Sequence, residues 1–203
     1  MKTLLKINSS ILTSGNANRL ADAFVTRWQA AHPQDRVIER DLTRDPIPHL
    51  DEITLTGFGT PAEKRTPGQA AAVALSDTLI AELRAADVIV LGVPMYNFGI
   101  PSPLKAWIDH IARAGITFKY SESGPVGLLQ GKKVYVLAAR GGLHAGSERD
   151  AQTQYLRTIL GFLGMTDIEF VYAEGLAMGV EYKTRAEQAA LSRIESLTAR
   201  QAA

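Results

Sequence analysis

The stretch from Asp87 to Val93 constrains the fold more than any other part of the chain. After Asp87 it is a run of Val, Ile, Leu and Gly, with no polar side chain at alternate positions. A strand that is apolar at every position is buried on both faces, which is typical of the centre of a parallel sheet. Because parallel strands need long crossover connections, usually helices, this segment predicts an α/β fold.

The rest of the chain alternates between strand-like and helical segments. Four more strands are expected, at Thr3 to Asn8, Arg36 to Arg40, Lys133 to Ala138 and Ile168 to Ala173. Helical spacing of apolar residues lies between the strands, at Asn16 to Ala31, Thr66 to about Ala86, from Ser102 onward, Glu148 to Leu163 and Lys183 to Arg200. We therefore expect a doubly wound sheet of five parallel strands with helices on both faces, in one domain spanning residues 1–203.

Two segments do not fit this alternation. Leu42 to Arg65 contains three prolines and two glycines and is expected to be an excursion with short helical turns, of a length that often serves function or an interface. Ile116 to Gln130 is glycine-rich and is expected to be irregular. Between them, Thr66, Pro67 and Gln69 form the pattern of a capping box and predict a sharp helix start.

Composition excludes several classes of function. The chain has 22 Lys and Arg against 21 Asp and Glu, a net charge of +1, which gives no support for a nucleic-acid or acidic-membrane partner. It has no cysteine, so redox chemistry needs a bound cofactor. The four histidines lack metal-ligand spacing, and no metal is expected. No signal segment is evident at Met1 to Asn8, and a cytoplasmic location is expected.

In a doubly wound sheet, ligands bind beyond the carboxyl ends of the strands. After the first strand, the loop from Asn8 to Asn18 is rich in Ser, Thr and Asn and opens a helix, whose free N–H groups suit a phosphate. The alternative is that these side chains only cap the helix.

The loops after the third and fourth strands have a different character. Pro94 to Pro101 is stiffened by two prolines and has an aromatic, apolar and amide centre that suits a flat heteroaromatic ligand, or else plugs the end of the sheet. In the next loop, Gly141 and Gly142 allow close approach of a ligand to the backbone, and Arg140 is either a charge partner or a surface residue.

Three well-known site motifs are missing from these loops. There is no G-x-G-x-x-G dinucleotide fingerprint, no P-loop and no G-x-S-x-G nucleophile elbow. The sequence therefore does not support a dinucleotide-binding Rossmann domain, a P-loop nucleotidase or an α/β-hydrolase.

The three loops, in this order, resemble the FMN-dependent NADH azoreductase and quinone reductase family, whose fold is flavodoxin-like. The most specific stretches are Pro94-Met95-Tyr96-Asn97-Phe98 and Arg140-Gly141-Gly142. Supporting stretches are residues 6–12, 112–120 and 161–164, so the resemblance spans essentially the whole chain.

The resemblance implies roles for matched positions. The FMN phosphate would be held by Ser10, Gly15, Asn16, Ala17 and Asn18. The isoalloxazine ring would be lined by Pro94, Met95, Tyr96, Asn97 and Phe98, and its pyrimidine edge by Ala139, Arg140, Gly141 and Gly142. The substrate pocket would be surrounded by Tyr120, His144 and Phe162.

The sequence departs from the family pattern at two points. Many members carry Ser-x-Ser-Asn in the phosphate loop, where this chain has Gly15-Asn16-Ala17-Asn18 and lacks two hydroxyls. The residue before Arg140 is often Ser and is Ala139 here. Neither position supplies a hydride-transfer group, but the first makes weaker FMN binding an expectation.

The resemblance implies a non-covalent FMN enzyme that oxidises NADH or NADPH and reduces quinones and azo compounds. A homodimer with FMN at the interface and a ping-pong order are also expected. The alternatives are a flavodoxin-like electron carrier, which the charge of +1 disfavours because such carriers are typically acidic, and an FMN-binding protein without turnover.

Overall fold

The computed structural model describes residues 1–200, and its centre is a five-stranded parallel sheet with the strand order β2-β1-β3-β6-β7. The strands are β1 (Thr3–Asn8), β2 (Arg36–Asp41), β3 (Val88–Pro94), β6 (Lys133–Ala139) and β7 (Asp167–Ala173). All neighbouring pairs run parallel. The predicted fold class is therefore confirmed. Every residue of β3 is buried, as expected for a strand that is apolar at every position.

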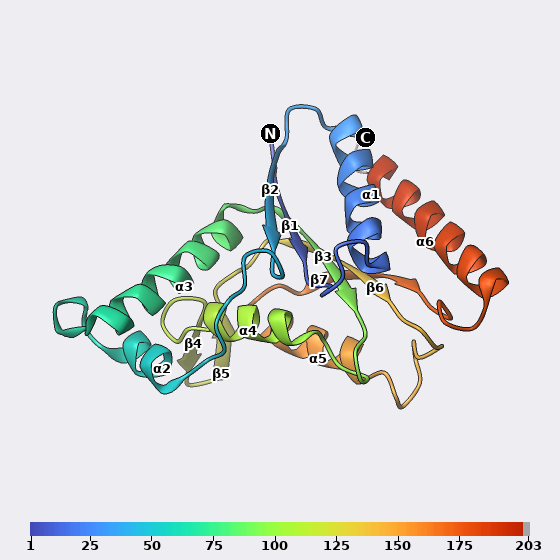
Figure 1. The fold of residues 1–203 in the computed structure, drawn as a ribbon. Helices are drawn as coiled ribbons and strands as arrows, with labels where there is room; N and C mark the ends of the chain where they lie inside the picture. Colours follow the sequence, from blue (N-terminus) through green and yellow to red (C-terminus); the bar gives the residue numbers. More distant parts are fainter. Residues whose placement is uncertain (201–203) are drawn as a thin grey trace.

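Helices cover both faces of this sheet (Figure 1). One face is covered by α1 (Asn16–Ala31) and α6 (Val180–Arg200), and the other by α3 (Pro67–Ala85), α4 (Ser102–Ile111) and α5 (Ala151–Phe162). Alternate residues of each central strand enter different cores. Ile89, Leu91 and Val93 of β3 pack toward α3 and α4, whereas Val88 and Val90 pack toward α1 and α6.

The apolar faces of helices α1 and α4 are buried, as the helical spacing of their apolar residues predicts. In α1 these are Leu20, Ala21, Phe24 and Trp28, and in α4 they are Leu104, Trp107, Ile108 and Ile111. The predicted capping box of α3 is present, with Thr66 accepting from the Gln69 backbone and Gln69 accepting from the Thr66 backbone. Helix α5 begins at Ala151, three residues later than expected, because the Asp150 side chain caps it by accepting from the Thr153 N–H.

The two segments outside the alternation contain more structure than the sequence indicates. The stretch 42–65 holds the helix α2 (Glu52–Gly59), capped by Asp51, and the 3₁₀ turn η1 (Ala62–Lys64), which agrees with the expected short helical turns. The expectation of an irregular segment at 116–130 is wrong. This segment contains the strands β4 (Phe118–Ser121) and β5 (Gly124–Gly127), which form an antiparallel hairpin.

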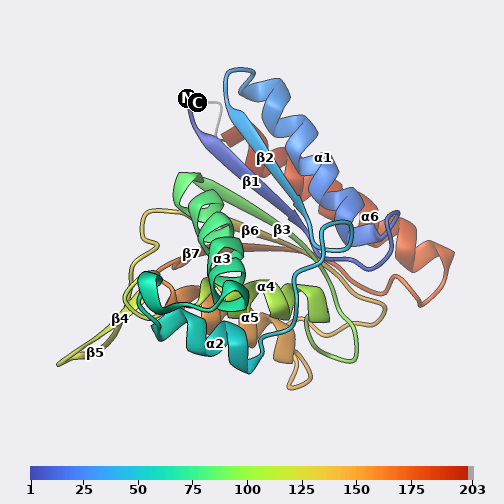
Figure 2. The same ribbon diagram turned by 60° about the vertical axis from the view of Figure 1, so that its left-hand side comes forward.

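The hairpin is not part of the main sheet. Figure 2 shows it projecting from the body of the protein beneath α3. Its strands have four residues each, and Tyr120 is three-quarters exposed. Strands this short, with only one apolar side chain packed inward, leave no periodic pattern in the sequence, which is why the segment reads as a loop. Separately, no helix within residues 1–200 is long and apolar enough to cross a bilayer.

Candidate active site

The loop after β1 ends at a helix that has no side-chain cap. Gly15 is the N-cap residue of α1, and no side chain within residues 1–200 accepts a hydrogen bond from the N–H groups of the first turn. The first bond of the helix runs from Arg19 N–H to the Gly15 carbonyl, 3.0 Å. The N–H groups of Asn16, Ala17 and Asn18 are therefore available, together with the positive end of the helix dipole, to an anion. The alternative that Ser and Asn side chains cap this helix is excluded.

Hydroxyl and amide side chains hold the loop in shape instead. Ser10 Oγ accepts from the Leu12 N–H at 3.2 Å and lies 3.3 Å from the Tyr96 hydroxyl. Asn18 Oδ1 accepts from the Ser10 N–H at 3.4 Å. Ser9, which the sequence analysis did not single out, donates to the Gly92 carbonyl at 2.7 Å. Ser9, Ser10 and Asn18 are all buried, so this loop is built around internal polar contacts.

Two glycines allow the close approach of this loop to its neighbours. A Cβ at Gly15 would lie 2.2 Å from Ser10 Oγ and 3.0 Å from the Leu12 carbonyl oxygen. A Cβ at Gly92 of β3 would lie 2.9 Å from the Ala17 carbonyl oxygen, in the first turn of α1. The absence of a hydroxyl at position 15, noted above as a departure, thus follows from space that the Ser10 hydroxyl already occupies.

The loop after β3 is tightly folded and has an unusual backbone. Asn97 and Phe98 have φ of 50° and 64°, the left-handed region that non-glycine residues rarely adopt. Tyr96 and Gly99 pair on either side of them, through hydrogen bonds of 3.2 and 2.9 Å. Within the described chain, the N–H groups of Asn97 and Phe98 donate to no protein atom. They are presented at the tip of the loop, where a ligand can accept from them.

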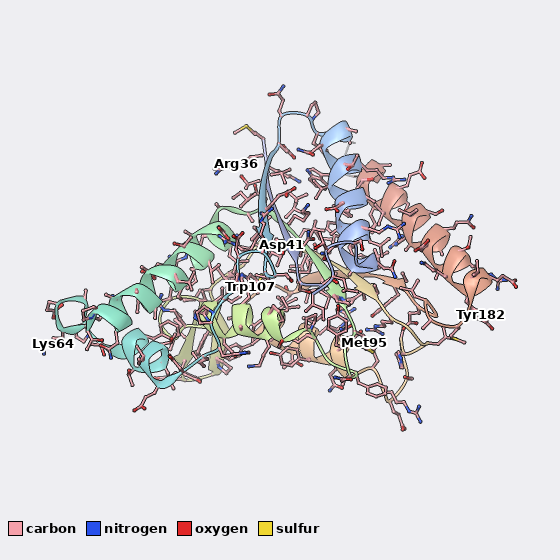
Figure 3. All side chains as sticks on the ribbon, viewed as in Figure 1. Arg36, Asp41, Lys64, Met95, Trp107 and Tyr182 are labelled. Carbon is pink, nitrogen blue, oxygen red and sulfur yellow. The ribbon has the colours of Figure 1, made fainter. Side chains whose placement is uncertain are left out.

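A cleft opens beside this loop. Its volume is about 660 Å³, and it is lined by residues of the loops after β1 and β3 and the start of α4: Ile11, Met95, Tyr96, Asn97, Ile100 and Ser102. Figure 3 places Met95 beyond the end of β3, near the start of α4. The cleft is therefore at the carboxyl edge of the sheet, as expected for a doubly wound fold.

The loop after β6 contains Arg140, whose side chain is completely buried. Its guanidinium donates to Asp150 Oδ1 at 2.9 Å, Thr153 Oγ1 at 2.8 Å and Glu174 Oε1 at 3.1 Å, and it lies 4.8 Å from the centre of the Tyr172 ring. Its backbone N–H and carbonyl are bonded to Ala173 and Leu176. All polar groups of Arg140 are thus bonded within the protein, and its contact with the cofactor stays a prediction.

The two carboxylates beside Arg140 also hold parts of the backbone. Burial acts to raise the pKa of Asp150, but hydrogen bonds from Arg140 and Thr153 outweigh it and leave the pKa below its ordinary value. Glu174 Oε1 also accepts from the His144 and Ala145 N–H groups, each at 2.9 Å. The N–H groups of Gly141 and Gly142 have no acceptor among the described residues. A rigid loop with two free backbone donors follows from this arrangement.

Gln152 connects the loops after β3 and β6. Its side chain accepts from Arg140 Nε at 3.3 Å and donates to the Pro94 and Gly99 carbonyls at 2.9 and 3.0 Å. Neither Gln152 nor Asp150 and Glu174 were expected from the sequence. They lie 10 to 34 residues from Arg140 along the chain, and no motif marks them.

Comparison with known proteins agrees with this architecture. A family model described as "Flavodoxin-like fold" matches residues 1–197. The chain belongs to this family.

The chain is also similar to individual proteins along most of its length. The chain is 55% identical over 197 residues to a protein of Dechloromonas aromatica (strain RCB) named FMN-dependent NADH:quinone oxidoreductase, covering 97% of this chain and 99% of the relative. A protein of the same name from Cellvibrio japonicus (strain Ueda107) is 56% identical over 180 residues, covering 88% and 90% of the two chains. A crystal structure of an FMN-dependent NADH-azoreductase from Bacillus anthracis str. Ames Ancestor in complex with FMN superimposes with a TM-score of 0.90 at 27% identity, covering 100% of both chains.

The three residues expected around the substrate pocket are not brought together within one chain of this flavodoxin-like protein. His144 lies beside the loop after β3, with its ring centroid 5.6 Å from that of Phe98, and its buried Nδ1 has no partner among the described atoms. Phe162 instead packs against Phe118, with 4.5 Å between the ring centroids, and the rings of Phe118 and Tyr120 have centroids 5.7 Å apart. Phe118 and Tyr120 belong to β4, and Figures 1 and 3 show the β4–β5 hairpin at the far end of α4 from Met95.

Proposed function

We propose that this chain is an FMN-dependent NADH:quinone oxidoreductase that also reduces azo compounds. The observation that carries the proposal is the uncapped start of α1 beside a cleft whose opposite wall presents free backbone N–H groups. A ligand that carries both an anionic group and a flat ring would place the anion at the start of α1 and the ring in the cleft. The names of the relatives at 55 and 56% identity supply the same cofactor, nucleotide and acceptor class.

The residues present fit FMN. Its phosphate would be held by the first-turn N–H groups of Asn16, Ala17 and Asn18, with Ser10 beside them, although the loop has fewer hydroxyls than many family members. Its ring would lie against Pro94 to Phe98, and its pyrimidine edge would face Ala139 to Gly142. Bound FMN supplies the hydride-accepting and electron-donating chemistry, because the chain has no redox-active side chain of its own.

The remaining role of the protein is to position groups and stabilise charge. The carbonyls of Gly141 and Gly142 accept hydrogen bonds from the Ala177 and Gly175 N–H groups, which orient this backbone. The free N–H groups of the two glycines would therefore stabilise negative charge on the reduced cofactor as preorganised donors. The N–H groups of Asn97 and Phe98 would fix the edge of the ring. The imidazole of His144 lies beside Phe98 and has a buried Nδ1 without a partner among the described atoms, and it would contact an acceptor bound over the cofactor.

An anaerobic reduction experiment tests this function against its rivals. The purified, FMN-loaded protein is mixed with NADH without oxygen, and the yellow absorbance is followed. Rapid bleaching followed by return of colour on adding a quinone supports the enzyme, whereas absence of bleaching supports an electron carrier or a binding protein. Heat-released flavin is identified by mass, and FAD, or no binding on reconstitution, would contradict the proposal. The same assay with NADPH decides the nucleotide.

We also propose a ping-pong order. With one side of the ligand space closed by the loop after β3, the nucleotide and the acceptor would both approach from the remaining side, and each must come within roughly 3–3.5 Å of the reacting atoms. They would therefore bind in turn. Parallel double-reciprocal plots at several acceptor concentrations are expected, and intersecting lines would mean that two separate binding surfaces exist.

The separation of Tyr120 and Phe162 from the cleft supports a homodimer in which the partner brings them to the site. The hairpin exposes Tyr120, and α2 exposes Ile53 and Leu55, so apolar surface is available for a second copy. Sedimentation at micromolar concentration is expected to give twice the mass of the 22.0 kDa chain. Replacing Phe162 by Ala should change acceptor KM and selectivity more than the rate of flavin reduction. A fully active monomer would overturn this assembly.

Two further parts of the proposal concern the whole chain. We place residues 1–203 in one FMN-binding domain, of which 201–203 lie outside the described residues, and we expect the protein in the cytoplasm. Limited proteolysis without a stable fragment, and cell fractionation, check these two statements.

A further inference from the structure

Arg140 and Gln152 form a buried connection beneath the two loops that face the proposed ring site. We propose that this pair is a positioning device: it holds the loop after β3 and the loop after β6 in one relative position and thereby sets the affinity for FMN. The inference rests on the proposed function for its ligand, but its mechanical part concerns this chain alone.

The first step is closure of the loop after β3. The Gln152 side-chain amide donates to the carbonyl of Pro94, where the loop leaves the strand, and to the carbonyl of Gly99, where it returns. The strained pair Asn97 and Phe98 lies between these two points. A left-handed conformation at non-glycine residues persists only when the surroundings impose it. Gln152 is the side chain that ties both ends of this loop.

The second step is the orientation of that amide. A guanidinium can only donate hydrogen bonds, so the Gln152 side-chain oxygen must face Arg140 Nε and its NH₂ must face the two carbonyls. The two carbonyls require the same orientation, because a rotated amide would set its oxygen against theirs. Arg140 reinforces this orientation by donating to the amide oxygen, which would otherwise be buried without that donor.

The third step links the other loop to the same guanidinium. Glu174 Oε1 accepts from Arg140 Nη1 and also from the N–H groups of His144 and Ala145. Asp150, which caps α5, is bonded to Arg140 Nη2, and Gln152 lies in the first turn of that helix. One buried side chain thus joins the loop after β3, the loop after β6, the start of α5 and the end of β7.

The hydrogen bonds around the buried Arg140 guanidinium depend on one another. A buried charge is tolerated only when it is paired and hydrogen-bonded, and losing one partner leaves the others uncompensated. Thr153 and the Tyr172 ring complete the surroundings of the guanidinium, and no polar group of Arg140 reaches the cleft. Arg140 would therefore act on the ligand only through the two loops.

The experiment compares three substitutions with a matched control. Gln152→Leu removes all three amide bonds from a buried site. Gln152→Glu keeps an acceptor for Arg140 but places oxygen against the Pro94 and Gly99 carbonyls. Arg140→Lys keeps the charge and loses the fork that reaches several partners at once. The control is Arg113→Lys, which changes another buried arginine, paired with Asp77 between α3 and α4 and without contact to either loop.

The first readout is amide hydrogen exchange in the apoprotein, which needs no cofactor. We expect the N–H groups of Tyr96 and Gly99 to exchange at least about tenfold faster in both Gln152 variants. The N–H groups of His144 and Ala145 should be accelerated in Arg140→Lys but nearly unchanged in Gln152→Glu. Arg113→Lys should leave both loops as in the parent.

The second readout is the FMN dissociation constant from fluorescence quenching. We expect a rise of about tenfold or more in the Gln152 variants relative to Arg113→Lys. Unaltered exchange in the loop after β3 of folded Gln152→Leu, or an FMN dissociation constant equal to that of the control, would overturn the proposal. If the parent itself binds no FMN, the proposed function fails while the exchange result still decides the positioning role.

Discussion

The loop after β1 and the loop after β3 reach the same edge of the sheet but are held there by different means. The first is held mostly by its own residues: Ser10 and Asn18 bond to groups within eight positions, and Gly15 leaves the room they need. The second is held from beneath, by a glutamine 58 residues away from Pro94 that is itself oriented by a buried arginine.

Because the two loops are held differently, they should respond to different kinds of substitution. In the loop after β1, substitutions that need space should act locally, on the turn at the start of α1. In the loop after β3, substitutions of distant buried residues should act on both the loop and the stability of the whole domain, because α5 and β7 share the same network. The predictions below test that separation, from the largest expected effect to the smallest.

The largest effect is expected for Arg140→Met. It leaves the largely buried carboxylates of Asp150 and Glu174 without their cation, and breaking a buried pair in this way typically costs about 3–5 kcal/mol. We expect a loss of that size in the free energy of unfolding from urea titration. A loss below about 1 kcal/mol, the usual effect of an exposed pair, would mean that the network is no more important than a surface ion pair.

The Arg140–Asp150 pair also makes the free energy of unfolding depend on pH. The pKa of Asp150 is lowered in the folded protein, so its contribution to stability is present above the ordinary value of 3.8 and is lost as the pH falls through the lowered folded pKa. In Arg140→Met the pKa of Asp150 should rise, because burial remains and the arginine is gone. The difference in unfolding free energy between the two proteins should therefore shrink at acid pH. A constant difference between pH 7 and 3 would contradict this assignment.

Gly92→Ala should have the next largest effect. Its methyl group would press on the Ala17 carbonyl at 2.9 Å and push the start of α1 away from β3. Overpacking of this kind costs about 1–3 kcal/mol, and we expect FMN affinity to fall while hydrogen exchange in the loop after β3 stays unchanged. Faster exchange in both loops would show that the two are not independently held.

Gly15→Ser tests the space within the first loop. The new side chain would displace the Ser10 hydroxyl from Leu12 and Tyr96, two bonds worth about 1 kcal/mol each, so FMN should bind more weakly although a hydroxyl has been added. The double variant with Ser10→Ala should recover affinity, because the crowding oxygen is removed. Equal affinities for the single and double variants would show that Ser10 does not occupy the space of residue 15.

The smallest effect is expected for Tyr96→Phe. It removes the 3.3 Å contact between the Tyr96 and Ser10 hydroxyls, the side-chain bond that joins the two loops directly. A single partly buried hydrogen bond contributes about 0.5–1.5 kcal/mol, so FMN affinity should change by no more than about tenfold. Calorimetric titration measures this change, and a larger loss would indicate a direct role of the hydroxyl in binding.

The fold could be predicted because its determinants are periodic. The uninterrupted apolar run of β3 indicates a covered parallel strand, and the helical faces of α1 and α4 follow from spacing alone. The β4–β5 hairpin could not be found in this way. With four residues in each strand and a largely exposed surface, it has no core-facing pattern for the sequence to display.

The site was predictable only in part. The positions of the loops follow from the topology, and the resemblance assigns them to phosphate and ring. The role of Arg140 could not be inferred, because a sequence does not indicate whether an arginine after a strand points outward to a ligand or inward to Asp150 and Glu174. Gln152 was missed because a single glutamine on a helix has no signature.

The order of the strands has a consequence for the edges of the sheet. Strands β2 and β7 are the outer strands of the sheet, so each leaves one row of backbone groups without a strand partner. Charged side chains interrupt both, at Arg36, Glu39, Arg40 and Asp41 in β2 and at Asp167 and Glu169 in β7. Charges on outer strands oppose the joining of one sheet to another, which is a common route to aggregation. In the proposed homodimer, contact between the copies would therefore be made by helices and loops, and each sheet would remain closed to further growth.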